Sequence, residues 1–417
     1  MSDNATQYYY PFFNQYVKVP KLVVDYVLLT YSLESENVQH CIGLIIVNLL
    51  AFNVIAYSRR KEHYTAKRTK HYTYTNMLRA VEITSQDGLS IKVLTGYRNK
   101  GYEKGISSIL SAGSRLEKIN ISNEFELDLE SLPLLIIDDI PVFENDKLLA
   151  IKNRIKRQSR SLRSKLKRLY EESLRLNRDY WNKIDIDTSN IDTKNKCFNR
   201  VSLTREFKDG EMGRWFQKGE MSYQQLSEEE RTKLRINGEK VVEIDYSAMH
   251  PHILYAWENK QCPSDCYESI MNQCACSRFV AKSMVLIAVN ADCYANVSRA
   301  VNNKKRETER ANRNRTIPEP VLYNELKKQN LTLKQVVEAI KIAHPTIEKY
   351  IYSASANKLM LVESDIMTSV LLKLMSLGIS ALPVHDSVIV PSRNEDVARR
   401  VMQDTYMEHT GFKITIK

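Results

Sequence analysis

Two aspartates that lie far apart in the chain each follow a run of aliphatic residues. Asp245 closes the segment Val-Val-Glu-Ile-Asp, and Asp386 follows Leu-Pro-Val-His. Such runs predict strands that each deliver one carboxylate to a strand end, although a single aspartate there is often only a cap or turn former. Two carboxylates on adjacent strands can hold two divalent metal ions about 3.5–4 Å apart, the spacing of in-line phosphoryl transfer. The pair therefore predicts a site for two Mg²⁺ ions, with Mn²⁺ as a substitute.

One pair of cationic residues with helical spacing lies between these aspartates. Arg278 and Lys282 are four residues apart in a helix predicted from Ser277 to Asn290, so their side chains share one helical face. Such a pair is often only part of a solvated face, but it can also clamp a triphosphate. Together with the two aspartates it indicates nucleotidyl transfer, which depends on metal ions and positioned reactants.

The elements that must position these residues follow from the sequence pattern. Residues 240–245 predict a strand that turns into a helix starting near Pro251, a favourable first-turn residue. Residues 357–376 predict a long amphipathic helix. Residues 381–390 predict a hairpin with His385 and Asp386 near its turn.

In these segments the chain resembles family A DNA polymerases, the right-hand enzymes with palm, fingers and thumb. The resemblance covers roughly residues 205–417 and is specific in the order and spacing of its short motifs. It implies an α+β fold with an antiparallel palm sheet and helical fingers and thumb. The similar segments are Tyr223-Gln224-Gln225-Leu226 before the first palm motif, Asp245-Tyr246-Ser247 in that motif, Arg278 to Lys282 in the fingers helix, and Val384-His385-Asp386 in the second palm motif.

The resemblance implies a role for each matched residue. Asp245 and Asp386 would ligate the two metal ions, helped by the backbone carbonyl of Tyr246, which also lies at the nucleotide site. Arg278 and Lys282 would bind the triphosphate of the incoming nucleotide. The metal would lower the pKa of the attacking 3′-hydroxyl, so no general base of unusual pKa is required.

Three further residues are expected to contact nucleic acid or sugar. His385 would lie near the primer end. His250 stands where family A enzymes have a glutamate that excludes the ribose 2′-hydroxyl and where family B enzymes have an aromatic residue. Its ring could gate the sugar, or it could cap the helix near Pro251. Arg214 precedes Trp215 and Phe216, and this group could stack on primer-template bases, while the two rings suit core packing equally well.

Other positions depart from the family pattern. Leu286 and Asn290 stand where the fingers helix would carry aromatic residues, so base stacking should differ. Ser387 replaces the glutamate expected after the second palm aspartate. The N-terminal half shows no exonuclease acidic set, which predicts the absence of proofreading.

These features predict a DNA polymerase of phage or plasmid type, without an exonuclease, that acts in DNA replication. Its partners would be a DNA primer-template, or RNA in its place, and nucleoside triphosphates. The nearest alternative is a single-subunit RNA polymerase or primase, which shares the palm and lacks the gating glutamate. Untemplated terminal addition and a non-catalytic replication initiator with a decayed palm are more distant alternatives.

Composition is consistent with a soluble protein that binds a polyanion. The 417 residues are 43% hydrophobic and 27% charged, and the formal net charge is +11. Seven cysteines and the lack of a signal peptide at the start favour a reducing cytoplasm. Residues 41–57 are strongly apolar, but Asn48 and Asn53 interrupt them, which favours a buried core helix over a membrane span. Nothing in the composition specifies an oligomeric state.

The pattern divides the chain into three blocks. Residues 1–150 predict an N-terminal nucleic-acid-binding region in which helices precede a strand at 89–94 and a basic loop with Arg98, Lys100 and Lys104. This order is compatible with a winged helix or with a plain α+β module. Residues 151–200 predict a basic helix, from Lys152 to Arg178, and a linker, which could form a thumb. Residues 201–417 predict the catalytic palm and fingers.

Four cysteines lie between the first palm motif and the fingers helix, at Cys262, Cys266, Cys274 and Cys276. Four thiolates can bind Zn²⁺ tetrahedrally, but this spacing is not that of the common paired knuckles. The sequence therefore favours free thiols over a zinc site.

Overall fold

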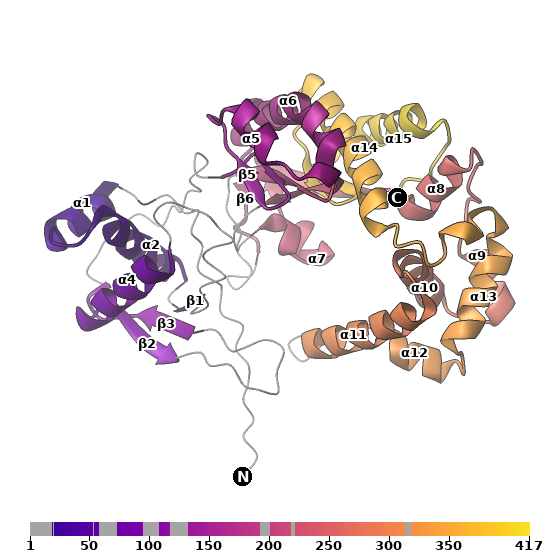
Figure 1. Ribbon diagram of the computed structural model, residues 1–417, viewed down its shortest axis with the longest axis horizontal. Coiled ribbons are helices and arrows are strands. Elements are labelled where there is room, and N and C mark those ends of the chain that lie inside the picture. Colours follow the sequence, from indigo (N-terminus) through magenta and orange to yellow (C-terminus); the bar gives the residue numbers. More distant parts are fainter. Residues whose placement is uncertain are drawn as a thin grey trace, which may run out of the picture. The chain divides into compact units, whose positions relative to one another are not determined.

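The computed structural model describes residues 19, 21–52, 54–57, 73–94, 108–116, 132–191, 201–217, 222–312 and 318–417 (Figure 1). The chain forms two compact units whose segments alternate along the sequence. The first unit comprises Met1–Asn153, Lys167–Thr204 and Phe216–Lys240, and the second comprises Arg154–Leu166, Arg205–Trp215 and Val241–Lys417. The block predicted from 201 to 417 therefore contributes to both units.

The first unit begins with a small α+β module, whose described residues form three helices and a three-stranded antiparallel sheet of order β1-β3-β2. The basic loop predicted to form a wing lies outside the described residues, so the winged helix stays a prediction. The elements are α1 (Lys21–Thr30), α2 (Glu36–Phe52), β1 (Val54–Tyr57), α4 (Tyr74–Gln86), β2 (Ser90–Leu94) and β3 (Ser108–Ala112).

Helix α2 forms the centre of this module's core, with Ile42, Ile45 and Ile46 fully buried. The prediction of a buried core helix at 41–57 is confirmed for its burial, but the predicted C-terminal end of the helix is wrong. The helix stops at Phe52 and residues 54–57 form β1, because a β-branched and aromatic run suits a strand. Within the described part of the chain, no helix is long and apolar enough to cross a membrane.

The basic segment predicted as one helix from Lys152 to Arg178 is broken. Lys156 adopts an extended backbone, with ψ of 158°, and separates α5 (Leu148–Arg154) from a short 3₁₀ turn and α6 (Arg160–Arg175). A π-helical turn at Leu176–Tyr180 follows. The buried stripe of this segment is thin and includes Leu162, Leu166, Leu169 and Leu176.

The remaining elements of the first unit are short. A hairpin of β4 (Leu135–Ile137) and β5 (Ile140–Val142) turns through Asp138 and Asp139, both at positive φ. Strand β6 (Ile186–Asp187) pairs with β9 (Arg235–Ile236), which follows the single-turn helix α7 (Glu228–Arg231). Strands β7 (Leu203–Lys208) and β8 (Glu211–Gln217) contribute their facing ends, Arg205–Trp215, to the second unit.

The second unit contains the predicted palm strands and most of the helices. Strand β12 (Ser387–Pro391) pairs in antiparallel fashion with β11 (Leu382–Val384) and with β10 (Glu239–Asp245). The strand, helix and hairpin expected at 240–245, 357–376 and 381–390 are all present, and the α+β class is confirmed. The helices are α8 (Met249–Trp257), α9 (Glu268–Cys274), α10 (Arg278–Asn290), α11 (Tyr294–Asn312), α12 (Leu322–Lys328), α13 (Leu333–Ala343), α14 (Ala356–Ser376) and α15 (Glu395–Thr410).

Candidate active site

The two aspartates predicted to ligate metal lie at one edge of the palm strands. Asp245 is the last residue of β10 and pairs with Ser387, the first residue of β12. Asp386 therefore lies one residue away, in the tight turn between β11 and β12. The Tyr246 amide also donates to the Asp386 carbonyl, with 3.4 Å between nitrogen and oxygen. Antiparallel pairing thus brings together two residues that are distant in sequence.

Both carboxyl groups have raised pKa values, and the charge of Asp386 contributes to the shift of Asp245. Burial, followed by the nearby charge of Asp386, raises the pKa of Asp245 to about 7 from its ordinary 3.8. Burial also raises the pKa of Asp386, and the charge of Glu363 adds to this effect. Two carboxylates that resist ionisation side by side form a site that a divalent cation would favour.

The donor set at this edge fits magnesium by its chemistry. Mg²⁺ prefers oxygen ligands and commonly binds through one or two carboxylates while it keeps several waters. Asp245, Asp386 and the main-chain carbonyl of Tyr246 supply oxygens only. Among the described residues, no group of three or more His, Cys, Asp or Glu side chains comes together as a metal site. In the part of the chain that the structure describes, the aspartates are thus a pair, to which main chain, water or substrate would add further ligands.

The Tyr246 side chain is fixed away from this edge. It is 1% exposed, its hydroxyl donates to the Met402 carbonyl at 2.6 Å, and its ring packs against Tyr406. The nucleotide contact predicted for Tyr246 can therefore come only from its main chain.

The C-terminal residues brace the strand that carries Asp245. The amide and carbonyl of Asp245 both pair with the main chain of Lys417, at 3.2 and 2.8 Å, and the Ser247 amide donates to the Thr415 carbonyl at 2.8 Å. The charge of Lys417 also lowers the pKa of Asp245, against the larger effect of burial. The sequence pattern gave no signal for this strand-like contact.

The fingers helix presents its two cations differently. Ser277 caps α10 by accepting a hydrogen bond from the Val280 amide, so Arg278 and Lys282 lie in its first two turns. Lys282 is exposed, and its charge is close enough to lower the pKa of Asp245. Arg278 instead pairs with Asp265 at 2.5 Å. Lys282 is thus the cation that the structure brings to the aspartates, while Arg278 would have to leave Asp265 to bind a triphosphate.

His250 and Arg214 converge on Glu363 of α14, which lies within the helix predicted at 357–376 and which the sequence pattern did not single out. Arg214 donates from Nε and Nη2 to the two carboxylate oxygens at 2.6 and 2.7 Å, and His250 Nε2 lies 2.8 Å from Oε2. Burial opposes ionisation of Glu363, but these partners hold its pKa below the ordinary 4.5. The available signal was its spacing, since Leu359, Glu363 and Ile366 follow the buried face of the helix.

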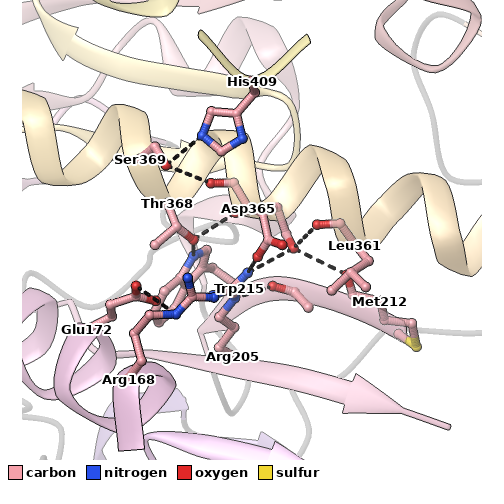
Figure 2. Close-up of polar contacts among 12 residues, drawn as sticks. Arg168, Glu172, Arg205, Met212, Trp215, Leu361, Asp365, Thr368, Ser369 and His409 are labelled. Atoms are coloured by element: carbon pink, nitrogen blue, oxygen red, sulfur yellow. Dashed lines mark hydrogen bonds and ion pairs between the residues drawn. The ribbon is translucent and has the colours of Figure 1, made fainter. Parts of the chain in front are cut away.

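A second network fastens α14 to the strands beneath it (Figure 2). Arg205 is 1% exposed and donates to the Gly213 carbonyl at 2.8 Å, to Ser364 Oγ at 3.2 Å and to Asp365 at 2.5 Å. Trp215 donates from Nε1 to Thr368 Oγ1 at 3.0 Å and is buried. Core packing, one of the two roles open for Trp215, is therefore the observed one.

The remaining candidates lie at or near the same edge. His385 is exposed in the β11–β12 turn, at a positive φ of 57°. Ser387, in place of a glutamate, donates to Glu243 at 2.7 Å, and the charge of Glu243 adds to the rise in the pKa of Asp245. Glu243 was also missed, although it is two residues before Asp245 and so on the same strand face.

Three of the four candidate zinc cysteines, Cys262, Cys266 and Cys276, are buried, while the Cys274 thiol donates to the Ile270 carbonyl.

In comparisons with known proteins, no family model matches the chain, and no curated protein matches it.

Proposed function

We propose that the chain is a template-dependent nucleotidyltransferase that extends a nucleic-acid 3′-hydroxyl with nucleoside triphosphates, and specifically a DNA polymerase. One observation carries the proposal: Asp245 and Asp386 meet at adjacent strand ends, and the pKa of each is raised. A partly buried pair of carboxylates with raised pKa values is costly to ionise without a cation, so its presence at a strand edge is better explained by metal-dependent chemistry than by stability.

The side chains around this edge suit the reaction. Asp245 and Asp386 would hold the metal ions, which when bound would polarise the α-phosphate and lower the pKa of the 3′-hydroxyl. Lys282, exposed on α10 and electrostatically coupled to Asp245, would neutralise the triphosphate. Arg278 would exchange Asp265 for phosphate oxygens, since a guanidinium binds either anion in the same forked geometry.

DNA synthesis is favoured over RNA synthesis by the position of His250. Its imidazole lies on the first turn of α8, five residues after Asp245, and a buried carboxylate holds it there. If the incoming sugar lies where the resemblance to polymerases implies, a ring fixed in this way would exclude a ribose 2′-hydroxyl.

Primer extension by an Asp386→Asn variant tests the proposal. The substitution keeps the shape of the side chain but removes one metal-binding charge, so extension of a primed template should be lost. Asp404→Asn, at an exposed position on α15, is the matched control and should extend like wild type. Full extension by a folded Asp386→Asn protein would rule out the metal assignment. Unprimed templates and both sugar types in the same assay distinguish a DNA polymerase from a primase or RNA polymerase.

A further inference from the structure

Glu363 is a buried acid without an assigned role in the proposed reaction. Its side chain is 0% exposed, and an ionised carboxylate is rarely found at such a position unless it is fully paired. It has two partners: Arg214, which binds both oxygens, and His250, which binds one of them. A carboxylate this deep cannot touch a substrate, so any effect on the reaction must pass through its partners.

His250 is the partner that can transmit such an effect. Its side chain is 16% exposed, so part of the ring faces outward while Nε2 is held inside by Glu363. Because Glu363 is ionised, its oxygen accepts the hydrogen and Nε2 donates it. That single bond fixes the rotation of a ring that would otherwise have several rotamers.

Arg214 has a different part in this arrangement. Its two parallel hydrogen bonds fix the plane of the Glu363 carboxylate and compensate the buried charge. The position of the carboxylate oxygen that faces His250 is thereby fixed before a nucleotide binds. Loss of Arg214 would loosen Glu363 without removing the acceptor that His250 uses.

We propose that Glu363 is a positioning residue that holds the His250 ring against the sugar of the incoming nucleotide and so sets discrimination against ribonucleotides. This inference rests on the proposed function. It assigns specificity to a residue that contacts neither sugar nor metal. Discrimination should therefore fall when the Glu363–His250 bond is lost, even though the imidazole itself remains.

The test is the ratio of kcat/KM for a deoxynucleotide to that for its ribonucleotide in Mg²⁺-dependent primer extension. Glu363→Gln keeps the volume of the side chain and weakens its bond to His250. It should lower the ratio by about tenfold or more, since a hydrogen bond to a charged group contributes more free energy than a tenfold change requires. Glu408→Gln, which breaks a surface pair with Lys373, is the matched control and should keep the wild-type ratio. A purely structural defect would lower both rates together and leave the ratio unchanged.

A double-mutant cycle separates positioning from an independent effect. His250→Ala alone should lower the ratio, and the combination with Glu363→Gln should lower it no further. An unchanged ratio in Glu363→Gln, or losses that multiply in the double variant, would overturn the inference. Arg214→Gln should change the ratio less than Glu363→Gln, and an equal or larger change would also overturn it.

Folding is checked by circular dichroism for every variant. If Glu363→Gln does not fold, Glu363→Asp keeps the charge for Arg214 but withdraws the oxygen from His250, and it should lower the ratio in the same way. A wild-type ratio in a folded Glu363→Asp protein would then overturn the inference. Failure of the proposed function would be distinguished from failure of this inference alone, because wild type would then extend primers with neither deoxynucleotides nor ribonucleotides. That result would also overturn the inference.

Discussion

The raised pKa of Asp245 predicts that a substitution at the centre of the candidate site stabilises the metal-free protein. The perturbation is Asp245→Asn, which is nearly isosteric and neutral at every pH. In the folded state the pKa of Asp245 is about 7, against an ordinary 3.8, chiefly because of burial and secondly because of Asp386. Each pKa unit corresponds to about 1.36 kcal/mol, so full ionisation costs the fold about 4 kcal/mol.

The sign follows from proton binding. Between pH 4 and pH 7 the folded protein keeps a proton on Asp245 that the unfolded chain has already lost, so the stability of wild type falls as pH rises. The Asn variant has no such proton and does not lose this stability. Because Asp245 is only partly buried, solvent screening brings the expected difference at pH 8 to about 2 to 4 kcal/mol in favour of the variant.

Urea unfolding in EDTA at pH 4.5 and pH 8 measures this difference, with Asp404→Asn as the control for a surface charge. The gap between variant and wild type should be small at pH 4.5 and should open at pH 8. Mg²⁺ should then narrow this gap at pH 8, because only wild type retains both carboxylates; at 100 times Kd the gain for wild type is about 2.7 kcal/mol. A variant that is equally destabilised at both pH values would refute the reasoning.

Three further predictions concern the residues that hold the site together. Arg205→Met should destabilise the protein by about 3 kcal/mol in urea unfolding, because it leaves a carboxylate without its buried partner. Gly213→Ala should cost about 2 kcal/mol or more by the same measurement, since φ is +85° and a Cβ would lie 2.6 Å from Ser364 Oγ. Deletion of Thr415–Lys417 removes three main-chain hydrogen bonds at Asp245 and Ser247, and it should cost about 3 kcal/mol and impair primer extension.

The parts of the site that the sequence predicted are those fixed by local pattern. The β-branched runs before Asp245 and Asp386 fix the two strands, and their pairing then places both carboxylates at one edge. The i,i+4 spacing of Arg278 and Lys282 likewise gives a shared helical face without any tertiary information.

The parts of the site that the sequence did not predict are the ion pairs between charged residues. Nothing in the sequence pattern pairs Arg278 with Asp265, thirteen residues earlier in a loop. Nor does the pattern pair Arg214 with Glu363, 149 residues away. Such pairs are determined by how helices pack on strands, and neither periodicity nor propensity carries that information.

The position of Glu363 follows from a close approach between α14 and β8. Gly213 has no Cβ, so Ser364 can come within a distance that any other residue would obstruct. Arg205 then fixes that approach by binding the Gly213 carbonyl and the Ser364 hydroxyl at once. Arg214 follows Gly213 along β8, and Glu363 precedes Ser364 along α14. The close approach of Gly213 and Ser364 therefore brings Arg214 to face Glu363. A glycine and a buried arginine therefore determine where the carboxylate meets His250, which is why Gly213→Ala should disturb sugar choice as well as stability.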